Sequence, residues 1–408
     1  MDLKQNHANP SKRWRMLAIL AIALVLSMST WFSASAVLPQ LRSAWALTPS
    51  SAAWLTIAVQ IGFVCGALVS SLFNVADIVS PRHVIMGGAI GAGVANFLLL
   101  FAGGPEAGIP LRFATVFFLA GVYPPAFKLI STWFRDDRGL ALGILAAAIV
   151  VGNGIPHLVN GLGGLDWQIV ILVVSIQSLI GGLIAEFGIR KGPYPFPTAV
   201  FDPRQIGLAL TNRGVRLAAL GYIGHMWELF AMYAWILVFF IEVFKIQGVG
   251  TESTAAFATF VVFAVGGIGS WVGGILSDRW GRTNTTILMM SISGTCAILI
   301  GLLFHSNLYL TLLVGLIWGM TVIGDSAQFS TMVTETADQS YVGTALTIQL
   351  ASGFAVTVVT IWLIPILQDL FSWQWAFAFL APGPIIGILA MLRLKSLPEA
   401  AKIGGGKG

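Results

Sequence analysis

The sequence is a series of apolar segments, most of them twenty or more residues long, joined by short polar stretches. A helix of about 20 apolar residues is long enough to cross the hydrocarbon core of a bilayer. Within that core, only helices and closed barrels leave no backbone hydrogen-bonding group unsatisfied. The composition agrees, because 57% hydrophobic and 10% charged residues lie outside the range of soluble globular proteins. We therefore predict an all-α integral membrane protein.

Twelve such segments can be recognised, in two groups of six. The first group is Met16–Leu38, Ser51–Ala76, His83–Ala102, Pro110–Trp133, Gly139–Asn160 and Gln168–Ile189. The second group is Leu217–Phe244, Ser253–Leu276, Asn284–Phe304, Leu308–Thr331, Gly343–Ile366 and Gln374–Leu394. We predict an N-terminal six-helix half over residues 1–189 and a C-terminal half over residues 217–394.

The segments outside the two halves are polar. Residues 190–216 are rich in proline and basic residues, which predicts a cytoplasmic linker. Residues 395–408 are predicted to be a cytoplasmic tail, and we expect its glycine-rich end, residues 404–408, to be disordered. The first apolar segment also resembles a signal peptide, but its removal would leave an odd number of helices, so we interpret it as a membrane span.

The distribution of Lys and Arg predicts the orientation. Most of them fall on one side of the twelve segments; only Arg42, Arg112 and Lys245 fall on the other, and Lys128 lies within a segment. Cytoplasmic loops carry the excess of basic residues, so both termini and the linker are expected to be cytoplasmic. The sequence pI of about 9.4 is then explained by membrane lipids with anionic headgroups, and no nucleic-acid partner is expected.

One polar loop carries a dense motif between the eighth and ninth segments. It contains Gly274, Asp278, Arg279, Gly281 and Arg282 in the pattern G-x-x-x-D-R-x-G-R. An acid and a closing arginine recur about 200 residues earlier, at Asp77 and Arg82, but without the glycines. Two further pairs, Gly139 with Gly343 and Trp167 with Trp373, are separated by 204 and 206 residues. These nearly equal offsets indicate a parallel repeat of two six-helix halves.

With this loop, twelve segments and a six-helix repeat, the chain resembles the Major Facilitator Superfamily of secondary transporters, of the bacterial inner-membrane type. The resemblance implies a monomer that works by alternating access, needs no cofactor and uses a proton gradient. It assigns a gating role to the seven loop residues Asp77, Arg82, Gly274, Asp278, Arg279, Gly281 and Arg282. Gly274 is expected to allow a neighbouring helix to approach closely, and Asp278 to pair with a cation or a helix end. Arg112 resembles the helix-4 arginine of the family, as a candidate relay or gating residue, with anchoring at the interface as the alternative.

Ionisable residues at membrane depth are costly and point to function. Away from the segment ends they are Lys128, Glu228 and Asp325, in the fourth, seventh and tenth segments. The family resemblance implies that these helices line the central cavity. Glu228 is the preferred proton carrier, with His225 one turn before it. Lys128 is expected to attract an anionic substrate or to pair with Glu228 or Asp325.

Further polar side chains share helix faces at a spacing of about 100° per residue. The tenth segment places Trp318, Thr321, Asp325, Gln328, Met332 and Glu335 on one face, and the fifth places Asn153, His157 and Asn160 on another. We predict that Gln328, Asn153 and His157 reach the cavity, where Trp31 offers a stacking surface. The alternative is that these groups only join helices by hydrogen bonds.

The sequence therefore predicts a multi-pass transporter for a small organic solute, with an organic anion favoured because of Lys128. The main alternative is a proton-driven efflux pump for amphipathic drugs or cations. A metal-ion importer and a receptor that has lost transport are more distant alternatives. Nothing in the pattern indicates an enzyme or a metal site, because no nucleophile with a base, metal-ligand cluster or phosphate loop is found.

Overall fold

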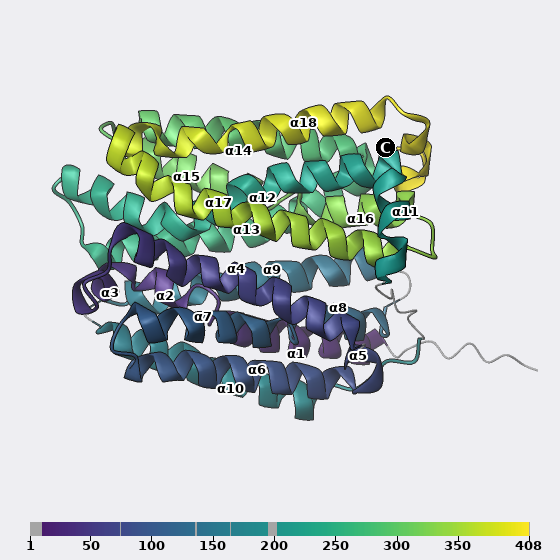
Figure 1. Cartoon of the computed structure of the whole chain (residues 1–408), viewed down its shortest axis with the longest axis horizontal. Coiled ribbons are helices and arrows are strands. Elements are labelled where there is room, and N and C mark those ends of the chain that lie inside the picture. The colour runs from purple at the N-terminus through teal and green to yellow at the C-terminus, as the bar shows by residue number, and fades with distance from the viewer. Residues whose placement is uncertain (1–9, 74, 135–136, 164, 195–201, 408) are drawn as a thin grey trace, which may run out of the picture.

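The computed structural model describes residues 10–73, 75–134, 137–163, 165–194 and 202–407, and in these ranges the chain is helical with no strand. The helices form two stacked layers of roughly parallel rods (Figure 1). Helices up to α10 make one layer and helices from α12 onward make the other, with the short helix α11 beside one end of the stack. We call this the α11 end and the opposite one, which carries α3, the α3 end.

The first layer contains α1 (Pro10–Met28), α2 (Ser33–Ala36), α3 (Leu38–Ala44), α4 (Pro49–Leu72), α5 (Val75–Ile78), α6 (Pro81–Phe97), α7 (Pro105–Leu119), α8 (Tyr123–Ser131), α9 (Arg138–Gly161) and α10 (Trp167–Gly188). A 3-10 turn, Leu98–Phe101, extends α6. The predicted linker, which follows the first layer in the chain, contains a 3-10 turn at Pro203–Gln205 and α11 (Ile206–Thr211). Residues 195–201 lie outside the described ranges.

The second layer contains α12 (Arg213–Ile246), α13 (Glu252–Trp280), α14 (Arg282–Leu302), α15 (Leu308–Val322), α16 (Ser326–Thr336), α17 (Val342–Ala376) and α18 (Pro382–Lys395). Two 3-10 stretches, Phe377–Leu380 and Pro398–Gly405, flank α18. In the described ranges, ten helical stretches are long and apolar enough to cross a membrane.

Several predicted membrane helices are broken rather than continuous. The first segment stops at Met28 and resumes at Ser33, the fourth breaks between Leu119 and Tyr123, and the tenth between Val322 and Ser326. In the fourth, the pair Pro124 and Pro125 opens the new helix, where missing backbone N–H groups cost nothing. At the break in the first segment, the carbonyl oxygens of Thr30 and Trp31 accept hydrogen bonds from Arg112 of α7, a partner that the local sequence does not reveal.

Helices α9 and α13 of the two layers approach each other closely toward the α3 end. A Cβ atom added at Gly154 or Gly161 of α9 would press against Phe263 or Phe257 of α13, so glycine permits this approach. At the start of α9, Gly139 and Gly143 have open space around them. The contact between α9 and α13 is therefore tight at the α3 end and loosens toward the α11 end.

The expected close helix approach at Gly274 is not present. A Cβ atom there would meet no atom within 4 Å, whereas one at Gly269 or Gly273 would collide with the backbone of Met320 or Gly324. The glycines that bring α13 against the broken tenth segment therefore lie before the loop motif, within the helix. Gly274 stands out in the sequence because it belongs to a recognisable motif. The residues that pack against a glycine cannot be recognised in this way.

The C-terminal tail is folded against the protein as far as Lys407, which differs from the expected disorder of residues 404–408; Gly408 lies outside the described residues. Ile403 is fully buried, and the backbone N–H of Gly404 donates a hydrogen bond of 3.0 Å to Glu335 Oε2. Lys407 Nζ donates to the carbonyl oxygen of Asp278 at 2.8 Å. The glycines supply positive φ angles, 56° at Gly404, that fold the tail back onto the loop between α13 and α14.

Candidate functional site

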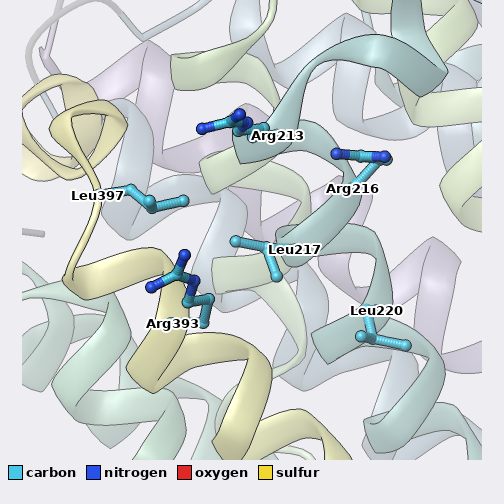
Figure 2. Close-up of a pocket in the computed structure, with 6 residues that line it drawn as sticks. All are labelled: Arg213, Arg216, Leu217, Leu220, Arg393 and Leu397. Atoms are coloured by element: carbon cyan, nitrogen blue, oxygen red, sulfur yellow. The ribbon is translucent and has the colours of Figure 1, made fainter.

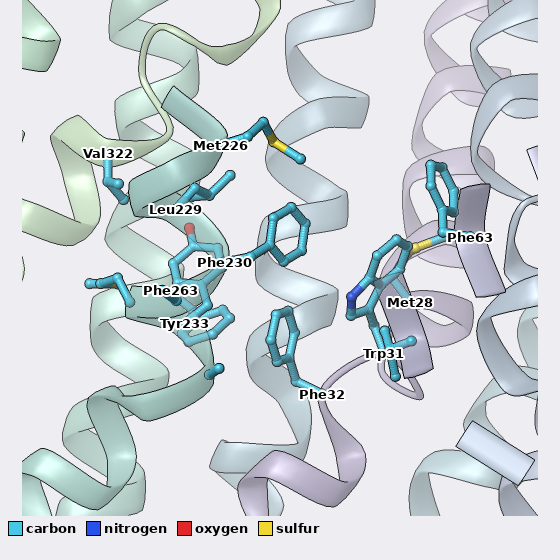
Figure 3. Packing of buried hydrophobic residues seen from close by; sticks show 14 of the residues in the cluster. Met28, Trp31, Phe32, Phe63, Met226, Leu229, Phe230, Tyr233, Phe263 and Val322 are labelled. Atoms are coloured by element: carbon cyan, nitrogen blue, oxygen red, sulfur yellow. The ribbon is translucent and has the colours of Figure 1, made fainter. Parts of the chain in front are cut away.

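Seven aromatic side chains join the two layers near the centre of the molecule. We call this set the aromatic interface; it comprises Trp31, Phe32, Phe63, Phe230, Tyr233, Phe263 and Phe354. Phe32 of the first layer lies 5.5 Å from Phe263 and 6.1 Å from Phe230, measured between ring centroids. Figure 3 shows Trp31 and Phe63 on one side, Phe230 and Tyr233 on the other, and Phe32 between them. The rings form an apolar seal that must part if the layers separate.

Buried polar groups without partners surround this aromatic interface. The atoms without a hydrogen-bond partner among the described residues are Trp31 Nε1, both amide atoms of Gln60, Asn153 Oδ1, both ring nitrogens of His157 and the hydroxyl of Tyr233. His157 lies 5.2 Å from the Phe263 ring, and Gln60 is one turn before Phe63 on α4. A buried polar group without a partner costs about 1–3 kcal/mol. Their clustering indicates a place where water or a polar ligand supplies the missing hydrogen bonds.

Three of the predicted cavity residues thus belong to one region. Trp31, Asn153 and His157 are all buried and lie at or beside the contact between the layers. Asn160, on the same face of α9, instead donates a 2.7 Å hydrogen bond to the carbonyl oxygen of Ala36, which joins two helices of the first layer.

Glu228 lies inside the second layer. Its side chain is 2% exposed; Oε1 accepts a 2.6 Å hydrogen bond from Trp318 Nε1 and Oε2 accepts a 2.9 Å hydrogen bond from Ser293 Oγ. The carboxyl group therefore connects α12 with α14 and α15 through two neutral donors. Trp318, which the sequence places on the polar face of the tenth segment, is here a hydrogen-bond donor to the acid.

His225 and Asp325 form a second buried pair, about one turn from Glu228 along α12. His225 Nδ1 lies 2.9 Å from Asp325 Oδ1, although the approach is not aligned as a hydrogen bond, and His225 Nε2 has no partner. Asp325 lies at the break between α15 and α16 and is 1% exposed. Two acids and one histidine are thus enclosed in the second layer.

Arg112 is buried in the first layer and holds the break in the first segment. It donates 2.9 Å hydrogen bonds to Thr30 O and Ser33 Oγ, a further one to Trp31 O, and one of 3.0 Å to Asn96 Oδ1. Asn96 in turn donates to Ser175 Oγ on α10 at 2.9 Å. The partners are carbonyl, hydroxyl and amide oxygens, so this arrangement fits a structural clamp better than the predicted relay.

Lys128 and Gln328 lie toward the α11 end of their layers. Lys128 is half-buried in the last turn of α8. Gln328 Oε1 accepts a 3.0 Å hydrogen bond from Arg282, which connects it to the loop motif instead of to the aromatic interface.

The loop motif makes an ion-pair cluster with α16. Arg282 donates from Nε and a terminal nitrogen to the Glu335 carboxylate at 2.8 to 3.1 Å, a forked geometry. Asp278 is exposed and lies 3.9 Å from Arg282, Arg279 is exposed, and Gly281 has a φ of 100° that suits glycine. The tail covers this cluster, because a Cβ atom at Gly281 would collide with the backbone of Lys407.

The earlier copy of the loop is held more loosely. Arg82 lies 3.6 Å from Glu186 Oε1, and the neighbouring His83 lies 3.0 Å from the same oxygen. The side chain of Asp77 lies outside the described residues.

Sequence reasoning missed Asn96, Ser33, Ser293 and Tyr233. Asn96 is the one amide in a long apolar segment, and this isolation was a signal that it has a buried partner. The small hydroxyls gave no such signal, because serine and threonine are common in membrane helices.

The fold and this buried polar centre define a multi-pass membrane protein built from two helical layers, the architecture of a solute carrier. A family model described as the Major Facilitator Superfamily matches residues 20–348, and the chain belongs to this family. Curated relatives of the chain are named as transporters of this family.

Curated relatives are distant. The MFS transporter asaE of Aspergillus flavus is 24% identical over 282 residues, which cover 64% of this chain and 58% of that protein. A Streptomyces coelicolor protein named "Probable actinorhodin transporter" is 24% identical over 217 residues, 51% of this chain and 36% of that protein. The chain therefore spans less than two thirds of either relative.

Solved structures share the fold over nearly the whole chain. A D-xylose–proton symporter superposes with a TM-score of 0.72 at 15% identity and covers 95% of this chain and 99% of its own. A nucleoside transporter gives a TM-score of 0.72 at 14% identity and covers 93% and 99%.

Proposed function

We propose that this protein is a proton-coupled secondary transporter that binds a small organic solute, carrying a flat ring and hydrogen-bonding groups, at the aromatic interface. One observation carries the proposal: five side chains with unpartnered buried polar atoms, Trp31, Gln60, Asn153, His157 and Tyr233, surround aromatic rings contributed by both layers. A ring can stack there while its polar groups satisfy these atoms.

The proposed topology has twelve spans in two six-helix halves, residues 1–189 and 217–394. The ten candidate spans become twelve when α1 is added and the stretch Val342–Lys395 is counted as two, because Ser372, with a φ of 61°, interrupts it. Both termini, the linker and the tail are cytoplasmic in this proposal, which places the α11 end inside. The tight contact at the α3 end then corresponds to a state that is closed toward the outside.

Coupling to protons is assigned to the second layer. Glu228, His225 and Asp325 are buried at membrane depth, exchange protons by ordinary acid–base chemistry and sit between helices that move in alternating access. The D-xylose–proton symporter among the structural neighbours shows that this fold supports such coupling.

The remaining candidate functions differ in the direction of transport and in the charge of the solute. The organic-anion prediction rests on Lys128, which lies toward the α11 end rather than in the aromatic interface. The efflux alternative is supported by the two buried acids, Glu228 and Asp325, which can supply negative charge for a cationic solute. In either case we expect a monomer in a cell membrane, the inner membrane if the host is bacterial, with lipids as its surroundings and no cofactor.

The test is the unfolding temperature of the purified protein against nucleosides, monosaccharides, aromatic carboxylates and lipophilic quaternary amines. A solute at ~100 times its dissociation constant adds about 2.7 kcal/mol to the free energy of unfolding. We expect a ring-bearing neutral or weakly acidic solute to stabilise the protein. Tyr233→Phe, which removes one hydroxyl, is expected to weaken that solute about tenfold, while Tyr309→Phe, at an exposed tyrosine, leaves it unchanged.

Other outcomes select other functions. Stabilisation by anions that is lost in Lys128→Ala and kept in Tyr233→Phe supports the organic-anion transporter. Stabilisation by quaternary amines alone, dependent on Glu228, supports the efflux pump. Either result removes the aromatic interface from the proposal.

A further inference from the structure

A cavity at the α11 end, far from the aromatic interface, is lined by arginines and leucines only. Its volume is about 410 Å³, and its lining residues are Arg213, Arg216, Leu217, Leu220, Arg393 and Leu397. Figure 2 shows the two arginines of α12 and Arg393 of α18 around a space in which Leu217 lies centrally. The first and the last long helix of the second layer thus share one pocket.

The lining residues change from arginine to leucine along α12. Residues 213, 216, 217 and 220 are related by three and four positions, so they lie on one face of α12. The arginines occupy the first turn and the leucines follow toward the middle of the helix. On the other wall, Leu397 follows Arg393 by four residues. The wall formed by α12 is therefore cationic at its outer end and apolar further in, while on the other wall Arg393 lies in the last turn of α18 and Leu397 just beyond its end.

The three guanidinium groups have no anionic partner among the described residues. All three arginines are exposed, no ion pair joins them to a described carboxylate, and no acidic residue lines the cavity. The positive end of the α12 dipole adds to the same potential. Orientation of the chain in a membrane explains why basic residues lie at this end, but it does not require three of them to gather around one cavity with leucines.

The cavity borders a surface that carries exposed apolar side chains. Leu220 of α12 is 39% exposed, and Leu389 and Leu392 of α18 are 60% and 50% exposed. In a membrane protein such residues face acyl chains. A ligand seated on the arginines has an apolar path along the leucines beside it.

We propose that this cavity binds an anionic phospholipid, with the phosphodiester on Arg213, Arg216 and Arg393 and the start of an acyl chain on Leu217 and Leu220. The proposal does not depend on the transported solute. A lipid held here bridges α12, which carries Glu228, to α18, and stabilises the packing of the second layer.

The experiment measures the unfolding temperature of the delipidated protein in a neutral detergent as phosphatidylglycerol, phosphatidylcholine or inorganic phosphate is added. The test variant is Arg213→Gln with Arg216→Gln and Arg393→Gln. The matched control removes three other exposed arginines, Arg15→Gln with Arg190→Gln and Arg204→Gln. A second variant replaces the three pocket arginines by lysine, which keeps the charge and shows that the site tolerates substitution.

We expect phosphatidylglycerol to stabilise the wild type, the control and the lysine variant. In the glutamine variant, the concentration for half of this effect is expected to rise on the order of a hundredfold, from three lost charge contacts. Equal stabilisation by phosphatidylcholine overturns the proposal, because the headgroup charge is then irrelevant. Equal stabilisation by inorganic phosphate would make the cavity a site for free anions and overturns the proposal. An equal loss of lipid stabilisation in the glutamine variant and the control would indicate surface charge alone and also overturns it.

Discussion

The two layers bury charge of opposite kinds. The first layer encloses Arg112 among carbonyl, hydroxyl and amide oxygens. The second encloses Glu228 between Trp318 and Ser293, and Asp325 beside His225. A guanidinium keeps its proton across the physiological range, whereas carboxyl and imidazole groups exchange theirs. Apart from His157, which lies beside the aromatic interface, the described part of the first layer buries a fixed charge that holds its shape, and the second layer buries titratable groups that can respond.

The largest expected effect is the loss of the fixed charge. Arg112→Leu leaves the carbonyl oxygens of Thr30 and Trp31 without this donor and removes one of the two donors to Asn96 Oδ1, so we expect the free energy of unfolding to fall by about 3 kcal/mol or more. Urea or thermal unfolding in detergent measures this, with the exposed Arg15→Leu as control. A loss below about 0.5 kcal/mol would show that Arg112 does not clamp the break.

Glu228→Gln is expected to affect function and to leave the fold nearly intact. The glutamine carbonyl can accept from Trp318 while its amide donates to Ser293, so we expect less than about 1 kcal/mol of destabilisation. In proteoliposomes, accumulation driven by a proton gradient should fall at least about tenfold, while exchange of labelled for unlabelled solute continues. Retained proton-driven accumulation would remove Glu228 from the coupling mechanism and weaken the contrast between the layers.

The smallest of the three effects is the difference in stability loss between arginine variants of the two loops. Arg282 makes a forked pair with Glu335, and Arg82 makes a single, longer approach to Glu186. We expect Arg282→Ala to cost about 1–2 kcal/mol of stability and Arg82→Ala under about 1 kcal/mol. Unfolding measured at low and high salt checks both values, since the more exposed pair at Arg82 should also be the more salt-sensitive. Equal losses for the two variants would show that the forked geometry at Arg282 adds no stability over the single approach at Arg82.

The long helices were predictable because crossing a bilayer demands a length and an apolar composition that are visible in the sequence. The breaks were not, because their stability depends on residues far away, such as Arg112, which satisfies carbonyl groups more than 80 residues earlier. Ionisable residues could be picked out by their rarity, and Glu228, Asp325 and Arg112 are indeed buried. Their partners Ser293 and Asn96 could not be picked out, because a hydrogen bond between two helices produces no pattern in a single sequence.

The folded tail has a practical consequence for handling the protein. Its last described residue, Lys407, rests on the glycine turn of the loop between α13 and α14 and contacts the carbonyl oxygen of Asp278. A purification handle or fluorescent fusion joined directly after the final glycine would crowd that turn sterically. Transport rates of such a fusion would then report a perturbed Arg282–Glu335 cluster, so the spacer that precedes the fusion becomes an experimental variable in its own right.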